Sequence, residues 1–157
     1  MAEPNSAQQR PPIELRVVAD PSQIPVTRSV AAVIAGQVDF DLDDISDVRL
    51  AVDEACSHLV TRAVSGATLD CVFAPAAHAL RVDVSAITVG AETATPRTFG
   101  WHVLTTLTDS LELTQVPAGE GTAVTTISFT KRATADAAQA GQSAPAGRAE
   151  NEGGSTW

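Results

Sequence analysis

The sequence predicts a two-layer α/β sandwich in which a largely antiparallel sheet packs on helices. Residues 68–74 are expected to pair with 79–85, and 111–116 with 122–130, because each pair of alternating segments is joined by a short turn. A doubly wound parallel sheet would need a helix between successive strands, and neither pair has room for one. Residues 43–64 supply the third observation, a long helix with an apolar stripe that a sheet can bury.

The N-terminal part of the chain predicts a strand followed by a helix. Residues 13–19 begin with the two-residue period of a strand. Pro21 follows, and a helix is expected from about residue 22 to residue 37. Its apolar stripe is roughly formed by Ile24, Val30, Ala31, Val33 and Ile34.

The long helix over residues 43–64 begins after the acidic loop 39–44. Carboxylates there complement the unpaired N–H groups and the positive end of the helix dipole. Glu54 and His58 lie one turn apart and therefore share a face of this helix. A separate core face is formed by Ile45, Val48, Val52, Ala55, Leu59 and Ala63.

The second half of the chain predicts two hairpins around a third helix. The hairpin turns are expected at residues 75–78 and 118–121. Residues 87–97 have no strong period and are expected to form a loop. The third helix is predicted over residues 98–109, with Gly100 near its start.

One folded domain is predicted over residues 13–132, a length that allows a single core. Residues 1–12 and 133–157 have too little apolar surface to offset the entropy of ordering them, so both are expected to be disordered. Trp157 is either a docking anchor or a solvated residue of this tail.

The formal net charge of -9 at pH 7 limits the partners. It argues against nucleic acid, whose phosphates need clustered Lys and Arg, and against an anionic membrane surface. A basic protein partner suits this charge better. The N-terminal residues have no apolar export signal, and no stretch reaches membrane-spanning length. Cys56 and Cys71 form no CxxC pair and fit the reducing cytosol, so a cytoplasmic protein is expected.

Four segments over about residues 13–131 carry a resemblance to a known family. They read LRVVADPSQIPVTRSVAAVIA, DDISDVRLAVDEACSHLV, FGWHVLTTLTDSLEL and GEGTAVTTISFTK. In this order they resemble the anti-sigma-factor serine kinases of the RsbW and SpoIIAB type, which belong to the GHKL group. The acidic loop and the DEAC sequence are most similar to those of the actinobacterial branch of this family, and within it to the mycobacterial anti-sigma-F factors. The resemblance implies a degenerate form of the Bergerat ATP-binding fold.

The resemblance also implies which residues would serve the ATP site. Glu54 stands at the place of the family's candidate general base, and His58 at the place of the Asn that ligates Mg²⁺. His58 is thereby the candidate metal-binding and nucleotide-binding residue of this helix. Because Mg²⁺ prefers hard oxygen ligands, the imidazole is expected to weaken Mg–ATP binding.

Other nucleotide positions of the family are kept only in part. The Asp that reads adenine falls on Ala86 or Ile87, and neither side chain can accept a hydrogen bond. The candidate nucleotide-binding residues that remain are Gly90, Gly100, Gly121 and Thr122. ATP and Mg²⁺ are therefore candidate cofactors at weakened affinity.

For function, the resemblance implies an anti-sigma factor that sequesters a stress-response sigma factor and is displaced by an anti-anti-sigma partner. Such a protein is a negative regulator of transcription. The alternative is an active ATP-dependent serine kinase that phosphorylates the anti-anti-sigma partner. Arg28 in the first helix is the candidate contact with both partners, and a homodimer is implied.

The residues by themselves leave plainer interpretations open. Glu54 and Arg28 can be solvated surface charges, and His58 a surface or half-buried residue, because the three histidines show no metal-ligand spacing. Cys56 is expected to be a small core residue. Residues 119–121 with Thr122 can be an ordinary hairpin turn.

Overall fold

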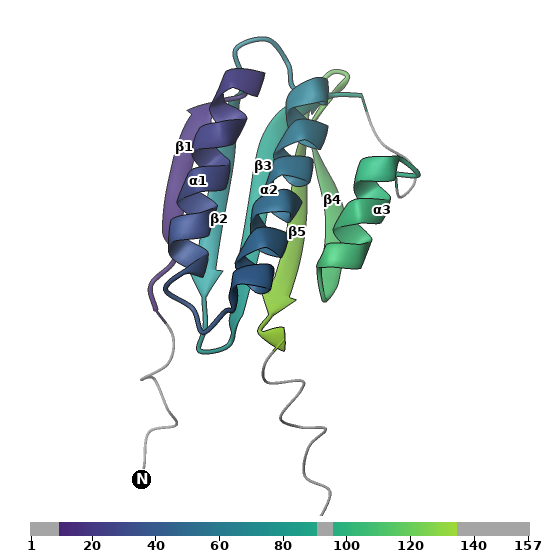
Figure 1. Cartoon of the computed structure of the whole chain (residues 1–157). Coiled ribbons are helices and arrows are strands. Elements are labelled where there is room, and N and C mark those ends of the chain that lie inside the picture. Colours follow the sequence, from purple (N-terminus) through teal and green to yellow (C-terminus); the bar gives the residue numbers. More distant parts are fainter. Residues whose placement is uncertain (1–9, 91–95, 135–157) are drawn as a thin grey trace, which may run out of the picture.

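The computed structural model describes residues 10–90 and 96–134 (Figure 1). Helices and strands follow one another in the predicted order, with a single 3₁₀ turn before the first helix. Their bounds are β1 (Ile13–Val18), η2 (Pro21–Gln23), α1 (Ile24–Ala35), α2 (Leu42–Arg62), β2 (Thr68–Pro75), β3 (Ala79–Val89), α3 (Phe99–Leu107), β4 (Ser110–Gly119) and β5 (Thr122–Arg132).

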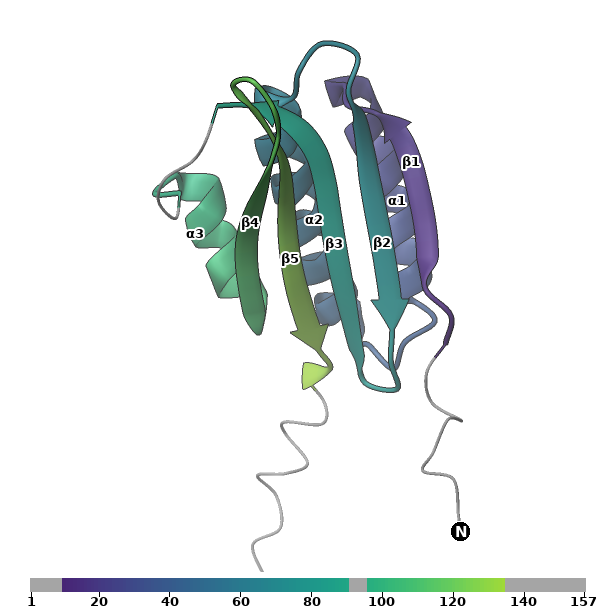
Figure 2. The same cartoon turned by 180° about the vertical axis from the view of Figure 1, so that it is seen from behind.

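The strands form one sheet in the order β1-β2-β3-β5-β4, and every neighbouring pair is antiparallel. The helices cover one face of this sheet, with α1 in front of β1 and β2, α2 in front of β3 and β5, and α3 beside β4 (Figure 1). Seen from behind, the other face carries no helix (Figure 2). The predicted two-layer α/β sandwich is therefore confirmed.

None of the helices in the described ranges combines the length and the apolar character that crossing a membrane would require.

The core lies between the sheet and the inner faces of α1 and α2. The predicted core positions Val48, Val52, Ala55 and Leu59 of α2 are fully buried. Cys56 is fully buried beside them, which confirms that it is a core residue. The hydrogen bond with Cys71, together with burial, raises the pKa of the Cys56 thiol. This thiol therefore stays protonated and fills space in the core.

The predicted loop at residues 87–97 is wrong at its start, because β3 continues to Val89. Ala86 and Thr88 point into the core, and Ile87 between them lies on the open face, so the strand alternation persists. The open-face positions here are apolar, and this hides the two-residue period in the sequence. Residues 91–95 of the predicted loop lie outside the described part of the chain.

The apolar stripe predicted for the first helix also needs correction. Val33 is 66% exposed, although it was expected in that stripe. The buried residues of α1 are Thr27, Ala31, Ile34 and Ala35. Successive residues of a helix are rotated by about 100°. The Val33 side chain therefore points well away from the buried Ala31, and it stays outside the core although its neighbour Ile34 is buried. Thr27 takes its place in the core because its hydroxyl donates to the carbonyl of Gln23.

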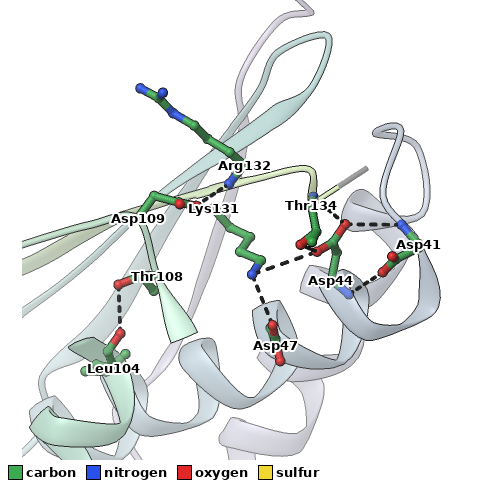
Figure 3. Close-up of polar contacts among 9 residues, drawn as sticks. All are labelled: Asp41, Asp44, Asp47, Leu104, Thr108, Asp109, Lys131, Arg132 and Thr134. Carbon is green, nitrogen blue, oxygen red and sulfur yellow. Dashed lines mark hydrogen bonds and ion pairs between the residues drawn. The ribbon is translucent and has the colours of Figure 1, made fainter. Parts of the chain in front are cut away.

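Helix α2 begins at a capping box built from two aspartates. The Asp41 side chain accepts a hydrogen bond from the Asp44 N–H at 2.8 Å, and Asp44 accepts in return from the Asp41 N–H at 3.4 Å. Asp44 is only 1% exposed, so its charge needs further partners. They come from the end of β5: the N–H and hydroxyl of Thr134 both donate to it, and the Lys131 ammonium lies 3.8 Å away (Figure 3).

These contacts extend the packed region past the last strand. Ala133 is 4% exposed, and Thr134 is held by Asp44, so the chain follows the domain for two residues beyond position 132. Lys131 also pairs with Asp47 at 3.0 Å, which adds a second bond between β5 and α2 (Figure 3). Most of the two segments predicted to be disordered, residues 1–9 and 135–157, lies outside the described residues.

Replacing Asp44 is expected to destabilise the domain much more than replacing its exposed neighbour Asp43. Asp44→Ala leaves the donors of Thr134 and Asp41 without their acceptor, and should lower the free energy of unfolding by about 2–4 kcal/mol. Asp43→Ala removes only a helix-dipole contact worth less than about 1 kcal/mol. Urea denaturation at pH 7 measures both changes. Equal losses in the two variants would contradict this account.

The contribution of Asp44 should also depend on pH. Burial alone raises the pKa of Asp44, but the hydrogen bonds from Thr134 and Asp41 and the Lys131 charge together lower it below its usual value. With a lowered folded-state pKa, the stabilisation is complete above the unfolded value of about 3.9 and is lost as pH falls through the folded-state pKa. The stability difference between wild type and Asp44→Ala should therefore shrink below about pH 4.

Candidate functional site

A cavity of about 240 Å³ lies between α2 and α3. It contains three of the residues singled out from the sequence, Glu54, His58 and Gly100. The other lining residues are Ser57, Thr61, Arg62, Thr98, Trp101 and Leu104. The α2 contributions recur every three or four residues and thus form one outward stripe, as the sequence predicts for Glu54 and His58.

At Gly100, α3 approaches the end of the Glu54 side chain closely. A Cβ added at Gly100 would lie 2.5 Å from Oε2 of Glu54, well inside a normal contact. The helix can begin here because the Thr98 hydroxyl caps it by accepting from the Trp101 N–H at 3.2 Å. The first turn of α3 therefore packs directly on the carboxylate of Glu54.

His58 is engaged by the next turn of its own helix and by α3. Arg62 Nη1 lies 3.2 Å from His58 Nδ1, and because a guanidinium has only donors, Nδ1 is the acceptor. The ring of Trp101 lies at a centroid distance of 6.2 Å from that of His58, with the two planes tilted by 53°. The nitrogen that bonds to Arg62 has no lone pair left for a metal ion.

The remaining predicted nucleotide residues lie at the end of the sheet and do not line this cavity. The Gly90 N–H donates to the Gly121 carbonyl at 2.8 Å, and Thr122 pairs with Val89 across β3 and β5. Gly90 and Gly121 have positive φ angles of 78° and 67°, so both positions favour glycine for backbone reasons alone.

Beside these glycines, the helix-facing side of the sheet ends in a small buried polar layer. The Thr88 and Thr125 hydroxyls are 2.7 Å apart, and Gln115 Nε2 donates to Thr125 at 2.9 Å. Ala86, one of the two candidates with Ile87 for the adenine-reading position, is 3% exposed and presents only a methyl group. In the described residues, no three His, Cys, Asp or Glu side chains gather as metal ligands.

Arg28 lies on the opposite side of α2 from this cavity, in a groove of about 220 Å³ between α1 and α2. Its Nη1 donates to Asp53 Oδ1 at 2.9 Å, with the two side chains 38% and 28% exposed. The structure thus divides the predicted residues among three places. Glu54, His58 and Gly100 share one cavity, Arg28 stands in a second groove, and Gly90, Gly121 and Thr122 form the sheet end.

Sequence reasoning missed several residues of these sites. Arg62 could have been found from its four-residue spacing to His58, and Thr98 from its position as a cap before an apolar helix. Asp53 could not, because its partner Arg28 is 25 positions away in the chain. Trp101 carried no signal beyond its place in the third helix.

Comparisons with known proteins agree with the fold. The family described as Histidine kinase-like ATPase domain matches residues 17–128. Anti-sigma-F factor RsbW of Mycobacterium tuberculosis (strain H37Rv) is 36% identical over 100 residues, which are 64% of this chain and 60% of that protein. The serine-protein kinase RsbW of Bacillus velezensis is 33% identical over 51 residues, 32% of each chain. The matched stretch thus spans less than two thirds of these relatives.

A solved structure, of the RsbU and RsbW domains of Rv1364c from Mycobacterium tuberculosis, superposes with a TM-score of 0.54 at 19% identity. The superposition covers 78% of this chain and 32% of the solved chain. At 19% identity, the similarity concerns the fold alone. The ATPase-domain match and the kinase relative support ATP binding as a general property of the fold.

The contact between Gly100 and Glu54 can be tested by a double-mutant cycle. Alanine is a better helix former than glycine, so Gly100→Ala should stabilise α3 by up to about 1 kcal/mol when Glu54 is also Ala. With Glu54 present the gain should be smaller, because the new Cβ displaces its carboxylate. Denaturant unfolding of the four proteins gives the coupling energy. Identical effects in both backgrounds would show that the two residues do not touch.

Proposed function

The chain belongs to the Histidine kinase-like ATPase domain family, and from this premise we propose that it is an anti-sigma factor. In this proposal it sequesters an alternative, stress-response sigma factor, is antagonised by anti-anti-sigma partners, and so regulates transcription negatively. Two relatives with the name RsbW, one of them an anti-sigma-F factor, support this function.

The observation that carries the proposal is the pair formed by Arg28 and Asp53. It holds a half-exposed guanidinium in a fixed direction on the helical face, at the position where the resemblance implies partner contact. An arginine held in this way can fork onto a carboxylate of a second protein with little further loss of side-chain freedom. A partner surface of this kind does not depend on the cavity at Glu54.

We further propose that Mg–ATP binding is weakened. Ala86 offers a buried methyl where a carboxylate is expected, and the neighbouring Thr88 hydroxyl is already bonded to Thr125. At His58, the imidazole replaces a hard oxygen ligand, and the positive Arg62 beside it disfavours a cation.

The proposal includes a cytoplasmic homodimer without direct contact to nucleic acid or membrane. Support for the dimer comes from the open face of the sheet, where Ile87, Val116 and Val124 lie side by side on three strands. They are 42%, 62% and 36% exposed, so together they form an apolar row. Rows of this kind commonly mark contacts with another protein. The net charge of -9 supports the exclusion of nucleic acid.

Arg28→Glu is expected to weaken binding of the cognate sigma factor at least tenfold, which corresponds to about 1.4 kcal/mol. Calorimetry with each purified alternative sigma factor of the source organism identifies the partner and measures the loss. The matched control is the exchange Arg28→Asp with Asp53→Arg, which keeps an ion pair in the groove but reverses its direction. This double variant should restore thermal stability without restoring affinity for the sigma factor. Unchanged affinity in Arg28→Glu would remove Arg28 from the partner surface.

Phosphorylation of the anti-anti-sigma partner is expected to be slow or absent. Two lost contacts, each worth about 1.5–3 kcal/mol, would weaken ATP binding by a few hundredfold or more. Incubation with Mg–ATP and the anti-anti-sigma protein, followed by mass spectrometry for phosphoserine, measures the rate. Any slow activity should disappear in Glu54→Gln, and sigma binding should hardly respond to nucleotide. Rapid, stoichiometric phosphorylation would instead favour the serine kinase, the alternative function.

A further inference from the structure

The groove between α1 and α2 contains more than the pair formed by Arg28 and Asp53. Ser46, Arg49 and Leu50 of α2 complete its lining. The four α2 residues recur at spacings of three and four, so they form one stripe that faces outward beside α1. This stripe begins one turn after the buried start of α2 and ends next to Glu54.

Arg49 is an exposed arginine to which the described residues offer neither a hydrogen bond nor an ion pair. Most other cations of the described ranges are already bonded: Arg10 to a carbonyl, and Arg16, Arg28, Arg81 and Lys131 to carboxylates. Within the groove, Arg49 is the arginine whose charge no described carboxylate balances, whereas Arg28 is paired with Asp53. The donors of Arg49 are available to an acceptor from outside.

Leu50, the neighbour of Arg49, is 45% exposed in the same groove. The charge of Arg28 is balanced by Asp53, so that end of the groove attracts an anion less strongly than Arg49 does. An incoming carboxylate is therefore directed to Arg49, and an adjacent apolar side chain can cover Leu50. The groove offers one strongly attractive, one apolar and one charge-balanced position in a fixed order, and this order sets the register of a partner.

We propose that this groove is a docking surface for the sigma factor, and that it receives a segment in which an acidic side chain stands beside an apolar one. Arg49 binds the carboxylate, Leu50 contacts the apolar group, and the charge-balanced pair of Arg28 and Asp53 favours this register over one shifted toward it. The inference rests on the proposed anti-sigma function and adds the residues that select the segment. Charge complementarity supports an acidic segment here, although the net charge of the chain favours a partner that is basic overall.

The test compares Arg49→Glu, Leu50→Ala and Arg132→Glu as full-length proteins. Arg132 is the matched control because its substitution changes the net charge equally, and its side chain points away from the domain at the end of β5 (Figure 3). Calorimetry uses the alternative sigma factor that binds the wild-type protein. Arg49→Glu should weaken binding at least tenfold and Leu50→Ala about threefold or more, whereas Arg132→Glu should change it less than twofold. Affinity for wild type should fall more steeply with salt than for Arg49→Glu.

A rescue experiment identifies the acidic side chain. Each exposed Asp or Glu of the bound sigma factor is changed to Lys, and one of these variants should recover binding to Arg49→Glu. Wild-type affinity in Arg49→Glu, or equal losses in Arg49→Glu and Arg132→Glu, would overturn the docking surface and leave the anti-sigma function in place. If no alternative sigma factor binds the wild-type protein, the proposed function itself fails.

Discussion

The buried carboxylate of Asp44 is the constraint on which the arrangement of the functional surfaces depends. Moving a charge out of water is unfavourable, so this aspartate is tolerated only because several donors converge on it. Those donors come from its own helix start and from the end of β5, two parts of the chain about 90 residues apart. Their convergence fixes where α2 begins and how it is rotated against the sheet.

The position of α2 in turn determines both sites. This helix is the middle one of three, with the groove of Arg28 and Asp53 on the side of α1 and the cavity of Glu54 and His58 on the side of α3 (Figure 1). Its inner face is almost entirely aliphatic, so its outer face is free to vary without loss of the core. The proposed partner surface and the cavity at Glu54 therefore use different residues of one helix, and residues of the cavity can change while those of the groove remain.

The glycines at the motif positions show that a match to the family pattern is not by itself evidence of a ligand site. Gly90 and Gly121 have positive φ angles and are joined by a backbone hydrogen bond at the sheet end, which explains them without a nucleotide. At Gly100, an added Cβ would meet the end of the Glu54 side chain. By contrast, His58 and Ala86 are positions where the sequence departs from the family pattern that it resembles. The backbone requirements of the fold are therefore separable from the proposed loss of side-chain contacts with Mg–ATP.

What the sequence determined is the set of local structures and their order. The hairpins, the capped start of α2 and its core face follow from periodicities and capping residues that neighbouring positions impose on one another. The end of β3 was missed because apolar residues on the open face conceal the alternation, and Val33 was misplaced because polar Thr27 occupies the buried stripe. The sequence also placed Glu54 and His58 on one face, since four residues make one helical turn.

Only the tertiary structure decided which side chains meet across elements. Asp44 with Thr134, Arg28 with Asp53, and Glu54 with Gly100 are separated by between 25 and 90 positions or lie on different helices. No periodicity links such residues, because their contact depends on how whole helices pack on the sheet. The order of Arg49, Leu50 and Asp53 follows from helical spacing within α2, but only the packing of α1 on α2 brings Arg28 to Asp53 beside them.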